Sequence, residues 1–149
     1  MKIGEGKLGR VFVARLEDGD KLPDCIEHLA MEKRILTGYA VLVGGIRDGN
    51  IVVGPRQPGI EKPEPILLPV DGVHEVVGIG TIAPDEEGSP VFHIHAALGR
   101  SGQTVTGCLR PGVTTWLVGE IIIFEITGVS VARLHDEVSG FSLLNILND

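Results

Sequence analysis

Two histidines and one cysteine have the spacing needed to share a metal ion. His93 and His95 are separated by one residue, and Cys108 lies in the segment that follows a tight polar turn. Successive residues of a strand point to opposite sides, so the two histidines would share one face, with Cα atoms roughly 6.5–7 Å apart. Imidazole and thiolate are both good zinc ligands. The pattern therefore indicates a candidate metal site with two nitrogen ligands and one sulfur ligand.

The element that would position these residues is an antiparallel hairpin. Residues 92–98 and 104–109 alternate apolar and polar, and residues 100–103 have the composition of a tight turn. If the middle two turn residues form the tip, Cys108 lies opposite His95, with Cα atoms roughly 4.5–5.5 Å apart. The same register gives the pairs Arg100–Gln103, Leu98–Val105 and Ala96–Gly107.

This register sorts the side chains of the hairpin onto two faces. The face expected to join the core carries Phe92, Ile94, Ala96, Leu98, Val105, Gly107 and Leu109. The more polar face carries His93, His95, Ala97, Thr104, Thr106, Cys108 and Arg110. The alternative to metal binding is that the histidines are solvated or interface residues and that the cysteine fills a small space.

The other segments predict several strands and one helix. Strands are expected over residues 7–16, 74–82, 114–127 and 129–134, and a strand or tail over residues 141–147. A second hairpin is expected over residues 39–53, with its turn at residues 44–50. Residues 22–36 carry apolar side chains at helical spacing, with a proline in the first turn. We therefore expect an α/β (α+β) fold, a mostly antiparallel β-sheet with one main amphipathic helix packed on one face.

The segment 114–127 is apolar on both of its faces. A single helix covers only one face of an antiparallel sheet, so a second apolar face needs another cover. We expect that cover to be another subunit, on the face that carries Ile121, Ile123 and the histidine cluster. A curled sheet that covers itself is the alternative.

Composition limits the class of protein. A chain of 149 residues with 43% hydrophobic content suits one domain over residues 1–149. The net charge of −7 argues against strong non-specific binding to nucleic acid. Two cysteines, no signal-peptide pattern and no apolar run long enough to cross a bilayer lead us to expect a cytoplasmic protein without a membrane span.

The order of segments along nearly the whole chain resembles the PPC domain (plants and prokaryotes conserved), which plant AT-hook nuclear proteins carry beside their DNA-binding hooks. The motifs that carry the resemblance are the opening strand, the helix entry Gly19-Asp20-Lys21-Leu22-Pro23, the turn Gly44-Gly45-Ile46-Arg47-Asp48, residues 74–82, the run from Phe92 to Leu98, residues 102–107 and the strand Glu120 to Phe124. The resemblance implies an antiparallel sheet, a helix on one face, and a homotrimer.

Prokaryotic members of that family resemble one another in a cluster of three histidines. His93 and His95 match the first two, whereas the segment Thr106-Gly107-Cys108-Leu109 has a cysteine in the third position. Because thiolate also binds zinc, the resemblance implies a site for zinc or a similar divalent metal with one open position. Glu75, at a position that the family usually fills with glutamate, could orient a ligand or act as a base; an exposed or interface carboxylate is the alternative.

Three functional interpretations remain. The first is a trimeric PPC-type module that binds a zinc-like ion and has a regulatory or DNA-associated role. The second is a metal-dependent enzyme acting on a small anionic substrate, in which the ion activates water and Glu75 or a neighbouring residue moves protons. The third is a metal-free interaction module. DNA association rests on the resemblance alone, because the basic core of an AT-hook is absent and Pro55-Arg56-Gln57-Pro58 is the nearest approach to it.

Overall fold

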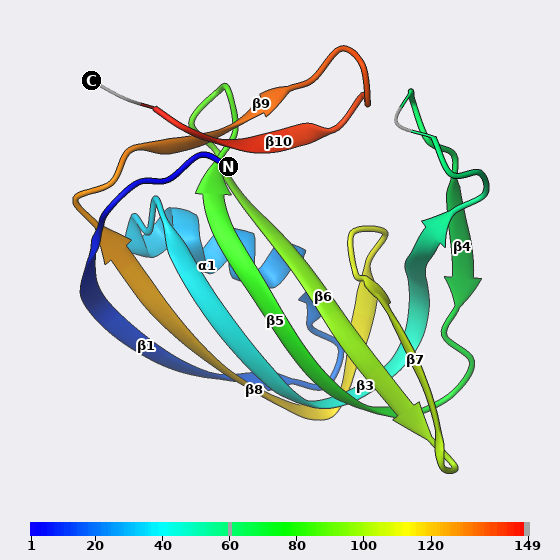
Figure 1. The fold of residues 1–149 in the computed structure, drawn as a ribbon. Coiled ribbons are helices and arrows are strands. Elements are labelled where there is room, and N and C mark those ends of the chain that lie inside the picture. Colours follow the sequence, from blue (N-terminus) through cyan, green and yellow to red (C-terminus); the bar gives the residue numbers. More distant parts are fainter. Residues whose placement is uncertain (60, 148–149) are drawn as a thin grey trace.

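The computed structural model describes residues 1–59 and 61–147 and shows a curved antiparallel sheet with a short helix across one face (Figure 1). The strands are β1 Lys7–Glu17, β2 Lys21–Leu22, β3 Gly38–Pro55, β4 Pro65–Pro69, β5 His74–Pro84, β6 Pro90–Arg100, β7 Gln103–Cys108, β8 Val113–Thr127, β9 Val131–His135 and β10 Ser142–Ile146, and the helix is α1 Asp24–Lys33. The main sheet has the order β1-β8-β3-β5-β6-β7, with β2 beside β8 and β4 beside β3. The predicted strands over residues 7–16, 74–82 and 114–127 are confirmed as β1, β5 and β8.

The last two strands form a separate two-stranded sheet. They correspond to the predicted strand over residues 129–134 and to the predicted strand or tail over residues 141–147, which is a strand. They pair with each other from Ser142 opposite His135 to Ile146 opposite Val131. In Figure 1 this ribbon crosses the end of β5, near both ends of the chain. Contacts between β5 and β9 attach it to the main sheet.

The prediction of a hairpin over residues 39–53 is wrong, because β3 is one continuous strand. Gly44 and Gly49 have positive φ angles of 145° and 115°, and the pairing with β8 shifts register in this region. A side chain at either glycine would collide with the backbone of the neighbouring segment. The glycines therefore let the strand bend and continue instead of turning back. Its first half pairs with β5 and β8, and its second half pairs with β4.

The helix is shorter than the predicted 22–36. Leu22 pairs with Val113 in the sheet, and Pro23 is the N-cap. Arg34 takes a left-handed conformation, with a φ angle of 54°, and its backbone N–H bonds to carbonyl groups of the last turn, which ends the helix before Leu36. Ile26 is among the helical side chains buried against the sheet. No helix in the described part of the chain has the length and hydropathy to span a membrane.

The core lies between α1 and the sheet, and it contains the side of β8 that the sequence assigned to an interface. Ile121 and Ile123 are fully buried in this core, so the prediction that they lie on the uncovered face is wrong. The uncovered face instead presents Ile122, together with exposed valines of β1 and β3. The pattern of β8 alone could not separate its two faces because both are apolar.

A charged clamp joins β1 to β8 at a break in their pairing. The register shifts between Leu8 and Val11, and the backbone N–H of Arg10 donates to the carboxylate of Glu125 over 3.0 Å. The Arg10 guanidinium adds two bonds of 2.7 and 2.6 Å to the same carboxylate, and a third to the carbonyl oxygen of Lys33 at the end of α1. These bonds lower the pKa of Glu125 to about 2. The clamp therefore ties the first strand and the helix to β8.

We predict that Glu125→Gln lowers the free energy of unfolding by about 1.5–3 kcal/mol at neutral pH, the range for hydrogen bonds to a charged group. The unfolded carboxyl titrates near its ordinary value of about 4.3, and the folded one near 2. The contribution is therefore complete above about pH 4.3 and is lost as the pH falls toward 2. Urea unfolding between pH 3 and pH 7 should show the gap between wild type and variant closing with acid.

The matched control is Glu17→Gln, which removes a carboxylate whose ion pair with Arg15 is exposed on both sides. Exposed pairs contribute little, so this variant should unfold like the wild type. A Glu125→Gln protein whose stability equals that of the wild type at pH 7 would contradict the role given to the clamp.

Candidate metal centre

The hairpin of β6 and β7 has the register that the sequence predicts. Arg100 pairs with Gln103 at the turn, and His95 pairs with Cys108 at the far end. The tip residues Ser101 and Gly102 both have positive φ angles, 50° and 78°. Two successive positive φ angles are typical of the tight turns whose twist matches that of the flanking strands. The turn thus fixes which residue of β7 faces each histidine of β6.

The hairpin places its apolar residues in the core and its three candidate ligands on the opposite face. Phe92 and Ile94 are buried in the core under α1, and the backbone N–H of Phe92 donates to the side chain of Glu27 on that helix over 2.9 Å. Because side chains alternate along a strand, His93 and His95 point away from the helix. The face assignment made from the sequence is confirmed for this hairpin.

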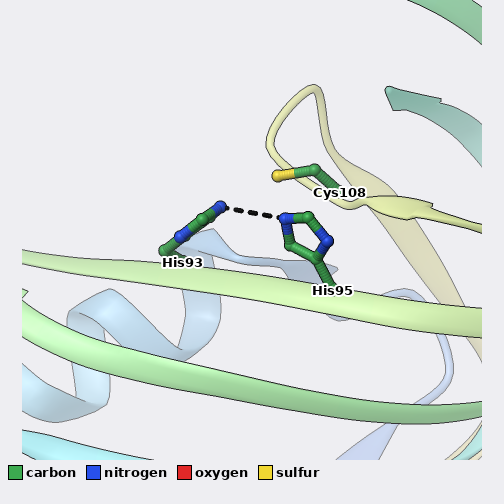
Figure 2. A group of neighbouring side chains, drawn as sticks. All are labelled: His93, His95 and Cys108. Carbon is green, nitrogen blue, oxygen red and sulfur yellow. Dashed lines mark hydrogen bonds between the residues drawn. The ribbon is translucent and has the colours of Figure 1, made fainter. Parts of the chain in front are cut away.

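The three side chains converge on one another, as Figure 2 shows. The Nε2 atoms of His93 and His95 lie 3.2 Å apart, and the two rings meet edge to face. One nitrogen from each ring and the Sγ atom of Cys108 all lie within 4.8 Å of one another. Two nitrogen ligands of a tetrahedral zinc ion, at about 2.0–2.1 Å from the metal, are separated by about 3.4 Å. The observed donor set therefore fits a tetrahedral ion with small side-chain adjustments.

The three donors differ in their exposure to solvent. Cys108 is 5% exposed, His93 is half-buried and His95 is exposed. Burial, followed by the charges of Arg133, His95 and Arg110, lowers the pKa of His93 to about 4. The His93 ring is therefore neutral at pH 7, which is the form that donates a lone pair to a metal. The site is closed at the cysteine and open beside His95.

Arg133 is a neighbour of the site that the sequence did not reveal. It belongs to β9, and its Nη2 donates to the Oγ1 atom of Thr81 over 3.0 Å. Thr81 is the partner of His93 in the pairing of β5 with β6. The signal in the sequence was weak, because one arginine in a short strand looks like a surface residue, and nothing in the sequence predicts that β9 crosses the end of β5.

The structure does not bring Glu75 to the group. Glu75 pairs with Gly99, whereas Ile79 is the residue opposite His95. Ile79 is four positions along the strand from Glu75, a distance of roughly 13 Å. The expected roles of Glu75 in orienting a ligand or moving a proton are therefore not supported by its position. Among the described residues, the His/Cys/Asp/Glu group with ligand spacing consists of His93, His95 and Cys108.

Comparison with known proteins identifies relatives of the whole fold. The family model of the Plants and Prokaryotes Conserved domain, abbreviated PCC or PPC, matches residues 3–127. A plant- and prokaryote-conserved protein from Pyrococcus horikoshii is 26% identical, with a TM-score of 0.84 and coverage of 99% of both chains. No curated protein matches the chain.

Two further solved structures are similar. A metal-containing protein from Archaeoglobus fulgidus is 26% identical, with a TM-score of 0.83 and coverage of 96% of this chain and 98% of its own. A protein from Ralstonia eutropha to which DNA binding has been ascribed is 20% identical, with a TM-score of 0.70 and coverage of 89% of each chain. The second likeness concerns the fold alone.

We predict that the ring of His93 titrates near pH 4 in metal-free protein, well below the ordinary value of about 6.5. Between these values the unfolded chain binds the proton and the folded chain does not, so stability falls as the pH drops below about 6.5. Ring-proton shifts followed by NMR from pH 3 to pH 8 measure the midpoint, and His93→Gln identifies the resonance. A midpoint near pH 6.5 would contradict the burial and charge effects described above.

Proposed function

This chain belongs to the Plants and Prokaryotes Conserved family, and on that basis we propose that it is a metal-binding protein that works as a homotrimer. The observation that carries the metal proposal is the convergence of His93, His95 and Cys108 within 4.8 Å. The metal we propose is zinc or a similar divalent ion, because two imidazoles and a thiolate form a donor set that suits zinc.

Three protein ligands leave a fourth position of a tetrahedral ion available. Sites of this kind bind an exchangeable ligand, whereas purely structural zinc sites are filled by four protein ligands. When bound, a divalent ion supplies a Lewis-acid centre at that position. Cys108 is the buried donor and the two histidines are the more exposed ones, so a ligand from solvent would reach the ion past the histidines.

We predict that protein purified without added metal contains about one zinc-type ion per chain, and that His93→Ala and Cys108→Ala lose most of it. Each variant removes one of three donors, so the remaining two bind weakly. Elemental analysis after dialysis measures the content. His28→Ala, which removes a histidine from the exposed side of α1, is the control and should keep the metal. Unchanged metal in the first two variants would remove this site.

The trimer proposal is supported by an apolar row on the sheet face that lacks a helix. Strand pairing aligns one residue from each neighbouring strand across this face. The row consists of Val13, Ile122, Val41, Ile79, His95 and Cys108. Four of these residues are apolar, and Val13, Ile79 and Ile122 are exposed. A contiguous apolar face of this kind is typical of a protein interface. The subunit number of three rests on the family resemblance.

We predict that the wild type has three times the mass of the 15.9 kDa chain in light scattering at micromolar concentration. Val77→Lys should lower that mass, because Val77 is 54% exposed on the apolar face and a lysine there opposes burial. Val138→Lys is the matched control, since Val138 is 51% exposed but precedes β10 at the other sheet. A monomeric wild type would refute the proposal, as would equal masses for both variants and the wild type.

Association with DNA is a weaker proposal for this chain. It is favoured by the family resemblance and opposed by the net charge of −7, since binding to phosphates depends on clustered lysine and arginine. Titration of duplex DNA at two salt concentrations decides it. Binding that weakens as salt rises would support association with DNA, and no binding at low salt would discard it.

A further inference from the structure

We propose that Arg133, with Arg110, binds a small oxyanion beside His93, so that the exchangeable ligand of the metal site is an anionic molecule with a carboxylate or phosphate group. That the anion is also a ligand of the metal rests on the proposed function, whereas the anion site itself rests on the contacts and burial of Arg133.

Arg133 is a charged side chain that is almost completely removed from solvent. The residue is 6% exposed, and its Nε atom is buried without a hydrogen-bond partner among the described residues. The bonds that Nη2 donates to Thr81, 3.0 Å to Oγ1 and 3.4 Å to the carbonyl oxygen, serve one end of the guanidinium. A buried donor without an acceptor carries the full cost of lost hydration. The unpaired Nε atom therefore points to an acceptor that the chain itself does not provide.

The strand pairing brings a second arginine close to His93. The backbone N–H of Leu109 donates to the carbonyl oxygen of Ile94, so the strand pairing extends beyond β7 and brings Arg110 alongside His93. Burial, followed by the charge of Arg110, lowers the pKa of the Arg133 guanidinium, whereas the charge of Cys108 raises it. Two like charges that act on each other and on the same half-buried histidine favour an anion near them.

The described residues contain no carboxylate that neutralises this pair. The ion pairs among them involve Arg10, Arg15, Lys33, Arg47 and Arg56, and neither Arg110 nor Arg133 takes part. Arg110 instead lies over the ring of Phe141 at 5.5 Å. Arginine presents a planar set of donors that matches the paired oxygens of a carboxylate or phosphate. The chemistry of the site thus selects an oxyanion over a neutral ligand.

The test is isothermal titration calorimetry of the wild type with sodium phosphate and, separately, with sodium acetate, in zinc-loaded and in metal-free protein. We expect binding of at least one anion, weakened about tenfold or more in Arg133→Met, because one charged hydrogen-bond partner is lost. Arg56→Met, in the loop after β3, should bind like the wild type. Phosphate binding alone would identify a phosphate ligand, and acetate binding alone a carboxylate ligand.

Zinc content of the same samples separates this inference from the proposed function. Unchanged zinc with weakened anion binding in Arg133→Met supports both. If the protein as purified contains no zinc but binds an anion in a way that depends on Arg133, the anion site is supported and the metal centre is refuted. If the wild type contains zinc but binds no anion, or if Arg133→Met binds the anion as tightly as the wild type does, the anion site is refuted.

If Arg133→Met does not fold by circular dichroism, Arg133→Lys takes its place. Lysine keeps the charge and the aliphatic stem but loses the forked donors, so binding should still weaken. A wild type that binds neither anion, combined with a lower mass for the Arg133 variant in light scattering, would overturn the inference and assign Arg133 to a subunit contact.

Discussion

The two-residue period of β6 is the constraint on which the rest of the molecule depends. Phe92 and Ile94 fill the core beneath α1, and this fixes His93 and His95 on the opposite face. A slip of one residue would bury both imidazoles and expose two large apolar side chains, a change that the core does not tolerate. The burial of the neighbouring apolar side chains therefore holds the two histidines in position.

The sequence was most informative where one face of a strand is apolar and the other is polar. In the hairpin of β6 and β7 this contrast, with a two-residue turn at Ser101 and Gly102, fixed the register and brought His95 opposite Cys108. It was least informative where both faces are apolar. In β8 the alternation gave no reason to prefer Ile121 over Ile122 as the core residue, and packing against the helix made that choice.

Two other features depended on contacts between distant segments. Glycines are common both in turns and in bends of a continuous strand, so Gly44 and Gly49 could not distinguish a hairpin from the long β3. Only the close approach of β8 and of the segment before it makes the bend necessary. Arg133 is a similar case, because its burial depends on β9 crossing the end of β5, and that connection has no local signature in the sequence.

The position of β9 and β10 gives the site two parts that differ in local stability. The histidine hairpin belongs to the main sheet, whereas Arg133 belongs to the small sheet of β9 and β10. Gly128, with a φ angle of 74°, joins the two parts. The small sheet is paired within itself and meets the main sheet over few residues, which is the arrangement expected of a unit that opens on its own and exchanges its amide hydrogens early. Opening of this small sheet would thus move the charge of Arg133 away from His93 while the main sheet keeps the three donors in place.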